Sequence, residues 1–482
     1  MEALGKRKRG GDDDDDSSAG GDRLSALPDH LLHEIISRLK VRQMVHTCEL
    51  SRRWRHLWAK VPRLDIDQHE FTDAVAGYKK FGDFVHFLLQ KVSIALLDEL
   101  RLHVHSGYIL GSADDDNASA WIRRAIMSSA QEPQREGVLN SGSWRLKTLH
   151  LSNLRHLDEL FAEHVRSRCP SLEHLELRVC TCQFHAIASG SLKSLALKCC
   201  TGKGFYEITS PTLRSLVVER GDNDSIITSP FVVTAPALAC LSLDISPYNF
   251  PGGVSFGEMA SLARASIHLL THRETLAKEK HLRDHLFKTL RSVSNAASLE
   301  LSGFDITVEA GEESTAFPEF NNLRNLELNK CGLCDDLQVS GRILRNSPNL
   351  EKLTLHLSPS WKVLVGEPLS SYPEFKNIRV LILHNYDPSD DFQTLLGCFL
   401  RSSPILEKLT LRCCKFLNDT KKRRGTSKMK NVVVENLVDV RCENLKHTEI
   451  IYKDDDVRQL VEFLLLFSRN LPNNNIRLTK VD

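Results

Sequence analysis

Cysteine is the residue type in this sequence with the most obvious capacity for metal chemistry, and several of the thirteen cysteines are close neighbours. The close groups are Cys331/Cys334, Cys180/Cys182, Cys199/Cys200 and Cys413/Cys414. Structural zinc sites use paired C-x-x-C motifs or mixed Cys and His sets, and the sequence has no paired C-x-x-C motifs. Four cysteines instead lie three residues after the last leucine of a repeated L-x-x-L-x-L pattern, where a small side chain packs inward; they are Cys180, Cys200, Cys331 and Cys414. We therefore predict structural cysteines, with no metal and no cofactor.

The segment His33-Glu34-Ile35-Ile36-Ser37 is the other candidate for metal chemistry, because it matches half of the H-E-x-x-H motif of zinc proteases. Serine stands where the second histidine ligand is required, so this segment lacks a zinc ligand set. The sequence also contains no Walker A loop and no G-x-S-x-G nucleophile motif. We therefore predict that the protein is not an enzyme and has no catalytic residues.

Polar side chains that alternate with the repeated leucines are better candidates for function. In an L-x-x-L-x-L strand the leucines point inward, so the residues that flank them point to the opposite face. Side chains from successive repeats then form one broad recognition surface. The candidates for target binding are His150, His174, Glu176, Arg178, Glu327, Lys352, His384 and Arg412. Their charges have no dominant sign, which favours a protein ligand over a polyanion; for any single residue, plain solvation is the simpler interpretation.

The repeats that must position these residues recur about every 20 to 28 residues, which is the period of leucine-rich repeats. Copies begin at Leu97, Leu146, Leu172, Leu192, Leu213, Leu238, Leu262, Ala296, Leu323, Leu350, Ile378 and Leu406. In five copies a proline stands two residues before the first leucine, where an extended strand is about to begin. The predicted fold is an α/β solenoid with parallel strands inside and helices or irregular segments outside. The long gap from Leu243 to Leu262 is expected to be a loop.

The stretch from residue 24 to residue 58 predicts a separate helical module. Leu27-Pro28-Asp29 is a helix start, because proline is tolerated in the first turn and aspartate favours the positive end of the helix dipole. The apolar residues that follow form a row wider than a single core-facing stripe; they are Leu31, Leu32, Ile35, Ile36 and Leu39. So short a module buries too little surface to be self-sufficient, so we expect its excess apolar surface to contact another polypeptide or the rest of this chain.

Three segments of this stretch carry a family resemblance: D-R-L-S-x-L-P-D-x-L-L at 22–32, I-I-S-x-L at 35–39 and L-S-R-R-W-R-x-L-W at 50–58. They resemble the F-box of plant F-box/leucine-rich-repeat proteins with an FBD-like C-terminus. The resemblance implies docking onto a Skp-type adaptor, and through it a cullin scaffold with its ubiquitin-transfer machinery. The docking residues that it implies are Leu27, Pro28, Leu31, Ile35, Val45, Leu50 and Trp54. Lys40 replaces the usual proline and Glu49 a usual apolar residue, and both are candidates for weakening the docking.

Composition excludes several other classes of function. The 482 residues include 63 basic and 62 acidic side chains, which leaves no overall charge for binding nucleic acid or an anionic membrane. No apolar run approaches the roughly 20 residues needed to span a bilayer, and the N-terminus lacks the apolar segment of a signal peptide. With Lys6-Arg7-Lys8-Arg9 as a candidate nuclear import signal, we expect the nucleus or the cytoplasm.

The predicted organisation is sequential. Residues 1–21 form a disordered charged tail, 22–64 the F-box, 65–95 a linker with a strand and a helix, 96–444 the repeats with a loop insertion at 106–142, and 445–482 an FBD-like strand-helix-strand cap. Together with the solenoid, the resemblance implies the substrate-recognition subunit of an SCF-type ubiquitin ligase, whose solenoid binds an unknown target protein. The alternative is a scaffold that uses the same repeats without delivering a target for ubiquitination.

Overall fold

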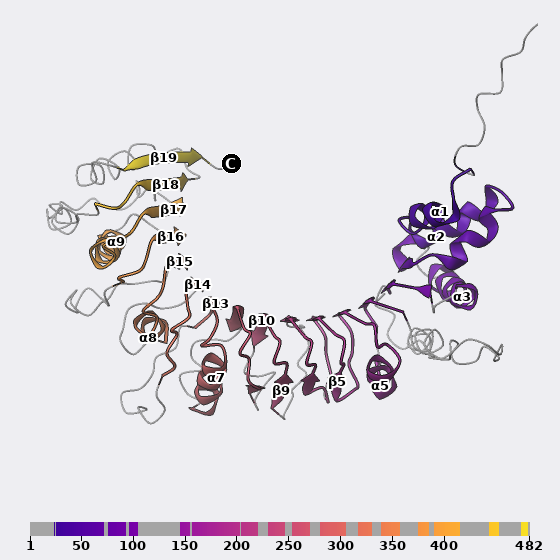
Figure 1. The fold of residues 1–482 in the computed structure, drawn as a ribbon, viewed down its shortest axis with the longest axis horizontal. Helices are drawn as coiled ribbons and strands as arrows, with labels where there is room; N and C mark the ends of the chain where they lie inside the picture. The colour runs from indigo at the N-terminus through magenta and orange to yellow at the C-terminus, as the bar shows by residue number, and fades with distance from the viewer. Residues whose placement is uncertain are drawn as a thin grey trace, which may run out of the picture.

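The computed structural model describes residues 24, 26–71, 76–92, 96–104, 145–154, 157–202, 204–219, 230–245, 253–269, 280–304, 317–329, 339–356, 375–384, 390–414, 443–452 and 474–480. These residues form an arch, with a group of short helices at one end and a long sheet that continues to the other end (Figure 1). No helix among them is long and apolar enough to cross a membrane.

The N-terminal helical module contributes the first part of the core. Pro28 stands immediately before α1, as the sequence predicted. Of the wide apolar row on this helix, Leu32 and Ile36 are buried, while Leu31 and Ile35 are exposed. The helices are α1 Asp29–Ile36, α2 Val41–His46, η1 Thr47–Glu49 and η2 Trp54–Lys60. The module therefore buries one side of α1 and leaves part of the other side open.

A sheet of 15 parallel strands forms the inner layer of the arch. Its order is β1-β2-β3-β4-β6-β8-β10-β12-β13-β14-β15-β16-β17-β18-β19. The strands are β1 Arg63–Asp67, β2 Glu99–His103, β3 Thr148–Ser152, β4 His174–Arg178, β6 Ser194–Lys198, β8 Ser215–Glu219, β10 Cys240–Ile245, β12 Arg264–Leu269, β13 Ser298–Ser302, β14 Asn325–Asn329, β15 Lys352–His356, β16 Val380–His384, β17 Lys408–Cys414, β18 His447–Tyr452 and β19 Asn475–Lys480. Each predicted repeat carries one of these strands, which confirms the solenoid.

The leucines of the repeats form a continuous core because neighbouring strands keep the same register. Leu326 of β14 is paired with Leu353 of β15, and Leu328 with Leu355, and all four are at most 2% exposed. The alternate residues point to the inner surface of the arch, as the period of a strand requires. The inward cysteine position is also confirmed where it is described: Cys180 is fully buried, and the thiol of Cys200 donates to the carbonyl oxygen of Leu177.

Helices cover the outer face of the sheet at its two ends, whereas strands cover it in the middle (Figure 1). The helices are α3 Ala76–Lys91, α5 Glu159–Ser167, α7 Lys280–Ser292, α8 Val339–Arg345 and α9 Asp390–Ser402. The outer strands are β5 Ala186–Ala188, β7 Glu207–Thr209, β9 Phe231–Thr234 and β11 Val254–Phe256, which form a second parallel sheet in the order β11-β9-β7-β5. The gap from Leu243 to Leu262, expected to be a loop, therefore contains a strand.

Aromatic side chains help to hold the second sheet against the first. The rings of Phe184, Phe205 and Phe231 form a row, with successive centroids 5.2 and 5.6 Å apart in edge-to-face geometry. All three rings are buried, and such contacts add to the stabilisation from area burial. The outer strands have at most four residues, too few to show a period of two in the sequence, which explains why they were missed.

Prolines before the repeats occupy turns. Leu172 N–H donates to the carbonyl of Cys169, and Leu350 N–H to that of Ser347, so Pro170 and Pro348 each take the second position of a four-residue turn. Proline is favoured there because its φ angle is already correct. The same arrangement recurs at Pro211, Pro236 and Pro404. The sequence placed these prolines at the entry to a strand. In the structure they lie in the turn that comes before the strand.

Both ends of the predicted repeat region continue into their neighbours. β1 spans the predicted boundary between residues 64 and 65 and begins the long sheet, and β18 and β19 of the predicted cap extend the same sheet. The predicted tail at 1–21, the insertion at 106–142 and the cap helix at 457–465 lie outside the described residues. The buried apolar residues of the arch form one continuous core from α1 to β18.

Candidate functional site

The helical module exposes large apolar side chains. Leu31 and Ile35, one turn apart on α1, are 38% and 42% exposed, and Leu50 is 63% exposed. Large apolar side chains that gather on a surface commonly mark a site for another protein. Pro28, at the start of the same helix, is also exposed. Four of the seven predicted docking residues are therefore accessible to a partner.

The other three predicted docking residues are turned toward the core of the module. Leu27 and Val45 are half-buried and pack against this core. Trp54 is only 2% exposed, so its indole cannot contact an adaptor while the module is folded. Its assignment as a docking residue is corrected: Trp54 is a core residue at the start of η2. The sequence pattern could not separate these roles, because both kinds of residue are apolar.

Arg53 fixes the start of α1. Its guanidinium donates to the carbonyl oxygen of Leu27 at 2.7 Å and to a carboxylate oxygen of Asp29 at 2.5 Å. The Arg53 hydrogen bond lowers the pKa of Asp29 below its ordinary value. These bonds join the segment that follows Leu50 to the turn that precedes Leu31, and so they link the two parts of the chain that carry the exposed apolar residues.

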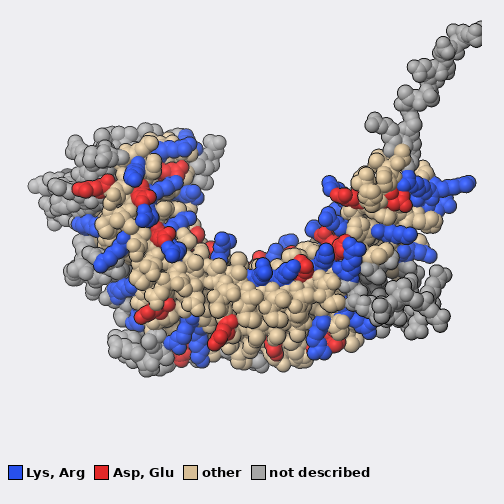
Figure 2. Space-filling model, viewed as in Figure 1, with Lys and Arg blue, Asp and Glu red and all other residues tan. Residues whose placement is uncertain are grey.

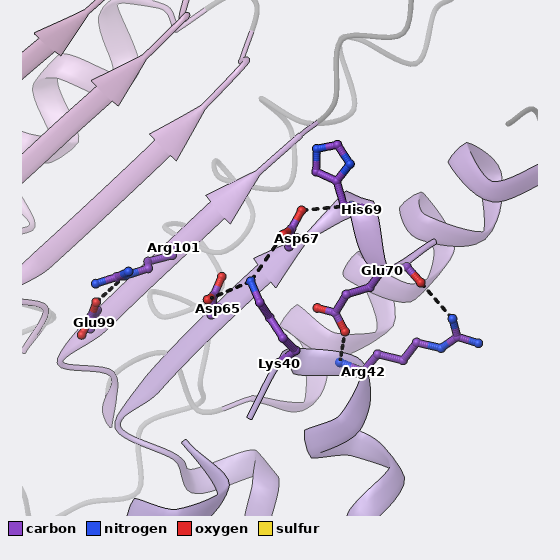
Figure 3. Close-up of polar contacts among 8 residues, drawn as sticks. All are labelled: Lys40, Arg42, Asp65, Asp67, His69, Glu70, Glu99 and Arg101. Carbon is purple, nitrogen blue, oxygen red and sulfur yellow. Dashed lines mark hydrogen bonds and ion pairs between the residues drawn. The ribbon is translucent and has the colours of Figure 1, made fainter. Parts of the chain in front are cut away.

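Lys40 lies at the junction between the helical module and the solenoid (Figure 3). Its ammonium is 3.3 Å from carboxylate oxygens of both Asp65 and Asp67 on β1. Partial burial alone would lower the pKa of Lys40, but the two carboxylates outweigh it and raise the pKa above its ordinary value. Lys40 was a candidate for weakening adaptor docking. In the structure its ammonium points to β1, the first strand of the sheet. Glu49 is exposed on η1, beside Leu50.

Arg42 makes a second connection across this junction. Its backbone N–H donates to a carboxylate oxygen of Glu70 at 3.1 Å, and its guanidinium donates to the Glu70 carbonyl at 2.9 Å (Figure 3). Glu70 belongs to η3 Gln68–Glu70, which directly follows β1. Burial raises the pKa of the Glu70 carboxyl. α2 is thus attached to β1 and η3 by several polar contacts at once.

Three side chains near this junction resemble a metal-ligand set. One potential ligand atom from each of Asp67, His69 and His103 lies within 4.8 Å of the others. No sequence motif indicates this group, because His103 meets Asp67 only through the register of β1 and β2. Two imidazoles and a carboxylate suit a divalent transition metal. Asp67, however, already receives the Lys40 ammonium and the His69 N–H, so the chain itself satisfies its carboxylate. We assign no metal to it.

The inner surface of the sheet carries the predicted target-binding residues, and basic and acidic side chains are mixed along it (Figure 2). His150 and Glu176, on neighbouring strands, lie 3.2 Å apart, and Lys198 pairs with the same carboxylate at 3.2 Å. His174 and Arg178 are exposed at the two ends of β4. The structure thus brings His150 and Glu176 together into one charged group on β3, β4 and β6.

A second group lies on β14 to β17. The carboxylate of Glu327 is 2.7 Å from the imidazole of His356, whose ring stacks on that of His384 with centroids 4.1 Å apart. Arg412 is the register neighbour of His384 on the next strand. Burial, His356 and Arg412 together lower the pKa of His384 to about 4. His384 is therefore an uncharged ring at neutral pH, and the charges on this part of the surface come from its neighbours.

Next to the second group, and sharing Glu327 with it, the inner surface has a depression of about 400 Å³, which we call the β13–β15 hollow. The predicted residues Glu327 and Lys352 line it, and so do Arg264 and Glu300, which sequence reasoning missed. Glu300 stands between Leu299 and Leu301, the same position that Glu327 takes between Leu326 and Leu328. That equivalence was the signal that could have found Glu300. Asn325 and Thr354 complete the polar lining.

Residues 24–65 match the model of the F-box domain. This match covers the helical module and ends within β1, at the junction that Lys40 and Arg42 build. A helical F-box that opens directly into a solenoid of leucine-rich repeats defines the class: an F-box protein with leucine-rich repeats.

Similar plant proteins are named for the F-box, and one of them also for leucine-rich repeats. The chain is 31% identical over 374 residues to the MEIOTIC F-BOX protein MOF of Oryza sativa subsp. japonica, with 70% of this chain and 71% of that protein covered. It is 27% identical over 437 residues to an F-box/FBD/LRR-repeat protein of Arabidopsis thaliana, with 81% of this chain and 90% of that protein covered. The chain belongs to the F-box/FBD/LRR-repeat family of plants, which confirms the resemblance drawn from residues 22–58.

Proposed function

We propose that this protein is the substrate receptor of an SCF-type ubiquitin ligase. In this proposal the F-box docks onto a Skp-type adaptor, which connects the chain to a cullin scaffold, and the inner surface of the solenoid holds the target protein. The receptor contributes no catalytic group. It raises the rate of ubiquitin transfer by keeping lysines of the target close to the ubiquitin-carrying enzyme.

The exposure of Leu31, Ile35 and Leu50 is the observation that supports this proposal most directly. Leaving large apolar side chains in water is unfavourable by roughly 1.5–3 kcal/mol for each fully exposed side chain, so a surface that keeps them suits a partner that covers them. The F-box match over the same residues identifies a Skp-type adaptor as the partner to test. The mixed charges of the inner surface support a protein as the target.

Copurification of the full chain with a Skp-type adaptor and a cullin tests the first part of the proposal. Retention of both proteins is the expected result, and no retention of the adaptor would overturn the proposal. A reconstituted ligase tests the second part, with a target captured by the solenoid as the substrate. Transfer of ubiquitin to that target is expected, whereas adaptor binding without transfer would favour the scaffold.

The location of the protein follows from the same proposal. A receptor of this type works where the cullin machinery is present, in the nucleus or the cytoplasm. The basic quartet Lys6-Arg7-Lys8-Arg9 supports the nucleus, and it lies outside the described residues. A fluorescent fusion of the full chain, compared with one in which the quartet is replaced by alanines, tests this assignment. Equal nuclear signal from the two fusions would show that the quartet is not the nuclear import signal.

A further inference from the structure

Two carboxylates face each other across neighbouring strands in the β13–β15 hollow. Glu300 of β13 and Glu327 of β14 are register partners, and both point to the inner surface of the arch. Neighbouring strands are about 4.8 Å apart, and like charges placed directly opposite each other are destabilising. The fold therefore keeps a pair of acidic groups that repel each other at the base of an open depression.

Among the described residues, these carboxylates receive hydrogen bonds and contact histidines, but no lysine or arginine lies within ion-pair distance of them. Ser266 donates to Glu300 at 2.9 Å, and the imidazole of His268 lies 3.4 Å from the same carboxylate. Glu327 contacts the imidazole of His356. Within the described part of the chain, neither glutamate forms an ion pair with a lysine or an arginine.

Other glutamates on the sheet are neutralised in a different way. Glu176, at the equivalent position of β4, pairs with Lys198 on the next strand, and Glu449 of β18 pairs with Lys408 at 3.6 Å. Each of these carboxylates has a lysine from a neighbouring strand. The pair in the hollow thus departs from the pattern used elsewhere on the same surface, and its negative charge is available to a ligand.

Two basic side chains flank the acidic pair. Arg264 of β12 and Lys352 of β15 occupy one register row, in which Ser298 and Asn325 lie between them. Three strand steps separate the two cations by about 14 Å. Among the described residues neither cation has an ion-pair partner. The hollow therefore presents two negative charges at its base and one positive charge on each side.

We infer that the β13–β15 hollow binds a segment of the target protein that carries an arginine with an acidic residue on either side. Arginine fits better than lysine, because its planar guanidinium has five donors and can bond both carboxylates at once. The acidic neighbours would pair with Arg264 and Lys352. An extended chain covers about 14 Å in roughly four residues, so the acidic residues are expected two positions before and two positions after the arginine.

This inference rests on the proposed function, since it takes the inner surface as the target-binding surface, and it specifies the chemistry of the target. The glutamates lie two residues further along their strands than the row of Arg264 and Lys352. That offset is about 7 Å, which a fully extended arginine side chain reaches from a backbone lying on the row. The backbone of the target segment is therefore expected to cross the strands above Ser298 and Asn325.

A labelled peptide, Ser-Glu-Ser-Arg-Ser-Glu-Ser, is the probe, and its binding to the full chain copurified with a Skp-type adaptor is measured by fluorescence anisotropy. Two control peptides carry citrulline in place of arginine, or arginine and glutamate exchanged. We expect the parent peptide to bind about 10-fold more tightly than either control, since charge-assisted bidentate contacts are lost in both. Equal binding of the parent and citrulline peptides, or no binding of the parent peptide, would overturn the inference.

Matched variants assign the effect to the acidic pair. Glu300→Gln with Glu327→Gln should weaken binding of the parent peptide about 10-fold and remove the preference over citrulline. Glu449→Gln, a control in the same register row on β18, should leave both the affinity and the preference for arginine unchanged. Because glutamine keeps the shape of glutamate and removes the repulsion between the two carboxylates, the double variant should melt no lower than the parent protein. A preference for arginine over citrulline that is retained in the double variant would contradict the inference. Adaptor binding in the same preparation reports separately on the proposed function.

Discussion

The ammonium of Lys40 and a carboxylate oxygen of Asp67 lie 3.3 Å apart, on the two sides of the junction between the F-box and the first strand of the solenoid. Asp65 receives the same ammonium at the same distance. A residue that departs from the usual F-box pattern is thus used to attach the F-box to the sheet. The orientation of the exposed side of α1 relative to the inner surface of the sheet depends in part on this contact.

Removing the Lys40 charge should loosen the junction without unfolding either side. Because the Lys40 side chain is 48% exposed, Lys40→Met is expected to cost only about 0.5 kcal/mol of stability. Hydrogen exchange should become faster in α2 and β1, which face the junction, and adaptor affinity should not change. Arg38→Met is the control, since Arg38 pairs with Glu34 within the F-box. Weaker adaptor binding by Lys40→Met alone would show that Lys40 belongs to the docking face.

The same pair gives a defined pH dependence. Burial alone would raise the pKa of Asp67, but the His69 N–H and Lys40 together lower it. The contribution of Asp67 to folding stability is therefore present above the ordinary pKa of 3.8, and it is lost as the pH falls through the folded pKa. The raised pKa of Lys40 gives a contribution that is present below 10.5 and is lost as the pH rises through the folded value. Melting curves of the parent protein and Lys40→Met should differ at neutral pH and converge at both extremes; a difference that persists in acid would exclude this pair as its cause.

Charged substitutions on the exposed side of α1 should weaken docking onto a Skp-type adaptor. Leu31→Asp or Ile35→Asp is expected to weaken adaptor binding by about 2 kcal/mol or more, roughly 30-fold, because each places a carboxylate where apolar contact is made. Calorimetric titration with the adaptor provides the measurement. Phe87→Asp is the matched control, since Phe87 is 49% exposed on α3, outside the F-box. If all three variants bind equally, the adaptor uses another surface.

Trp54 and Leu50 should separate folding from docking. Trp54→Ala empties a core position and is expected to destabilise the F-box by about 3–5 kcal/mol, so adaptor binding is lost through unfolding. Leu50→Ala removes an exposed side chain and should lower adaptor affinity with little change in melting temperature. Differential scanning calorimetry together with adaptor titration distinguishes the two. An unchanged melting transition in Trp54→Ala would return Trp54 to the docking face.

The depressed pKa of His384 predicts destabilisation in mild acid. The folded state keeps this imidazole neutral down to a pH of about 4, whereas an unfolded histidine binds a proton near 6.5. The unfolded chain therefore binds more protons between these values, and stability falls as the pH decreases through this window. His384→Phe should flatten the pH dependence of the melting temperature. NMR titration of the His384 ring gives an independent measurement, and a midpoint near 6.5 would contradict the prediction.

The repeat leucines were predictable from sequence, because their burial gives a regular period that survives even in the degenerate copy on β12. The second sheet was not, since three- and four-residue strands leave no period to detect. Contacts between distant segments were also invisible: Lys40 with Asp67, and His69 with His103, depend on how α2, β1 and β2 come together. Of the acidic pair, the sequence pattern identified Glu327 but not its register partner Glu300.

The outer strands β5, β7, β9 and β11 also determine how strongly the arch bends. Inner and outer strands repeat at the same spacing of about 4.8 Å, whereas an outer helix is about 10 Å wide and forces neighbouring repeats apart on that side. Curvature is therefore concentrated where helices cover the sheet, and the middle section is nearly straight (Figure 1). Six strand steps along this section separate β3 from β13, which places His150 and Glu300 about 29 Å apart. A target that uses both contact points must present them at that distance.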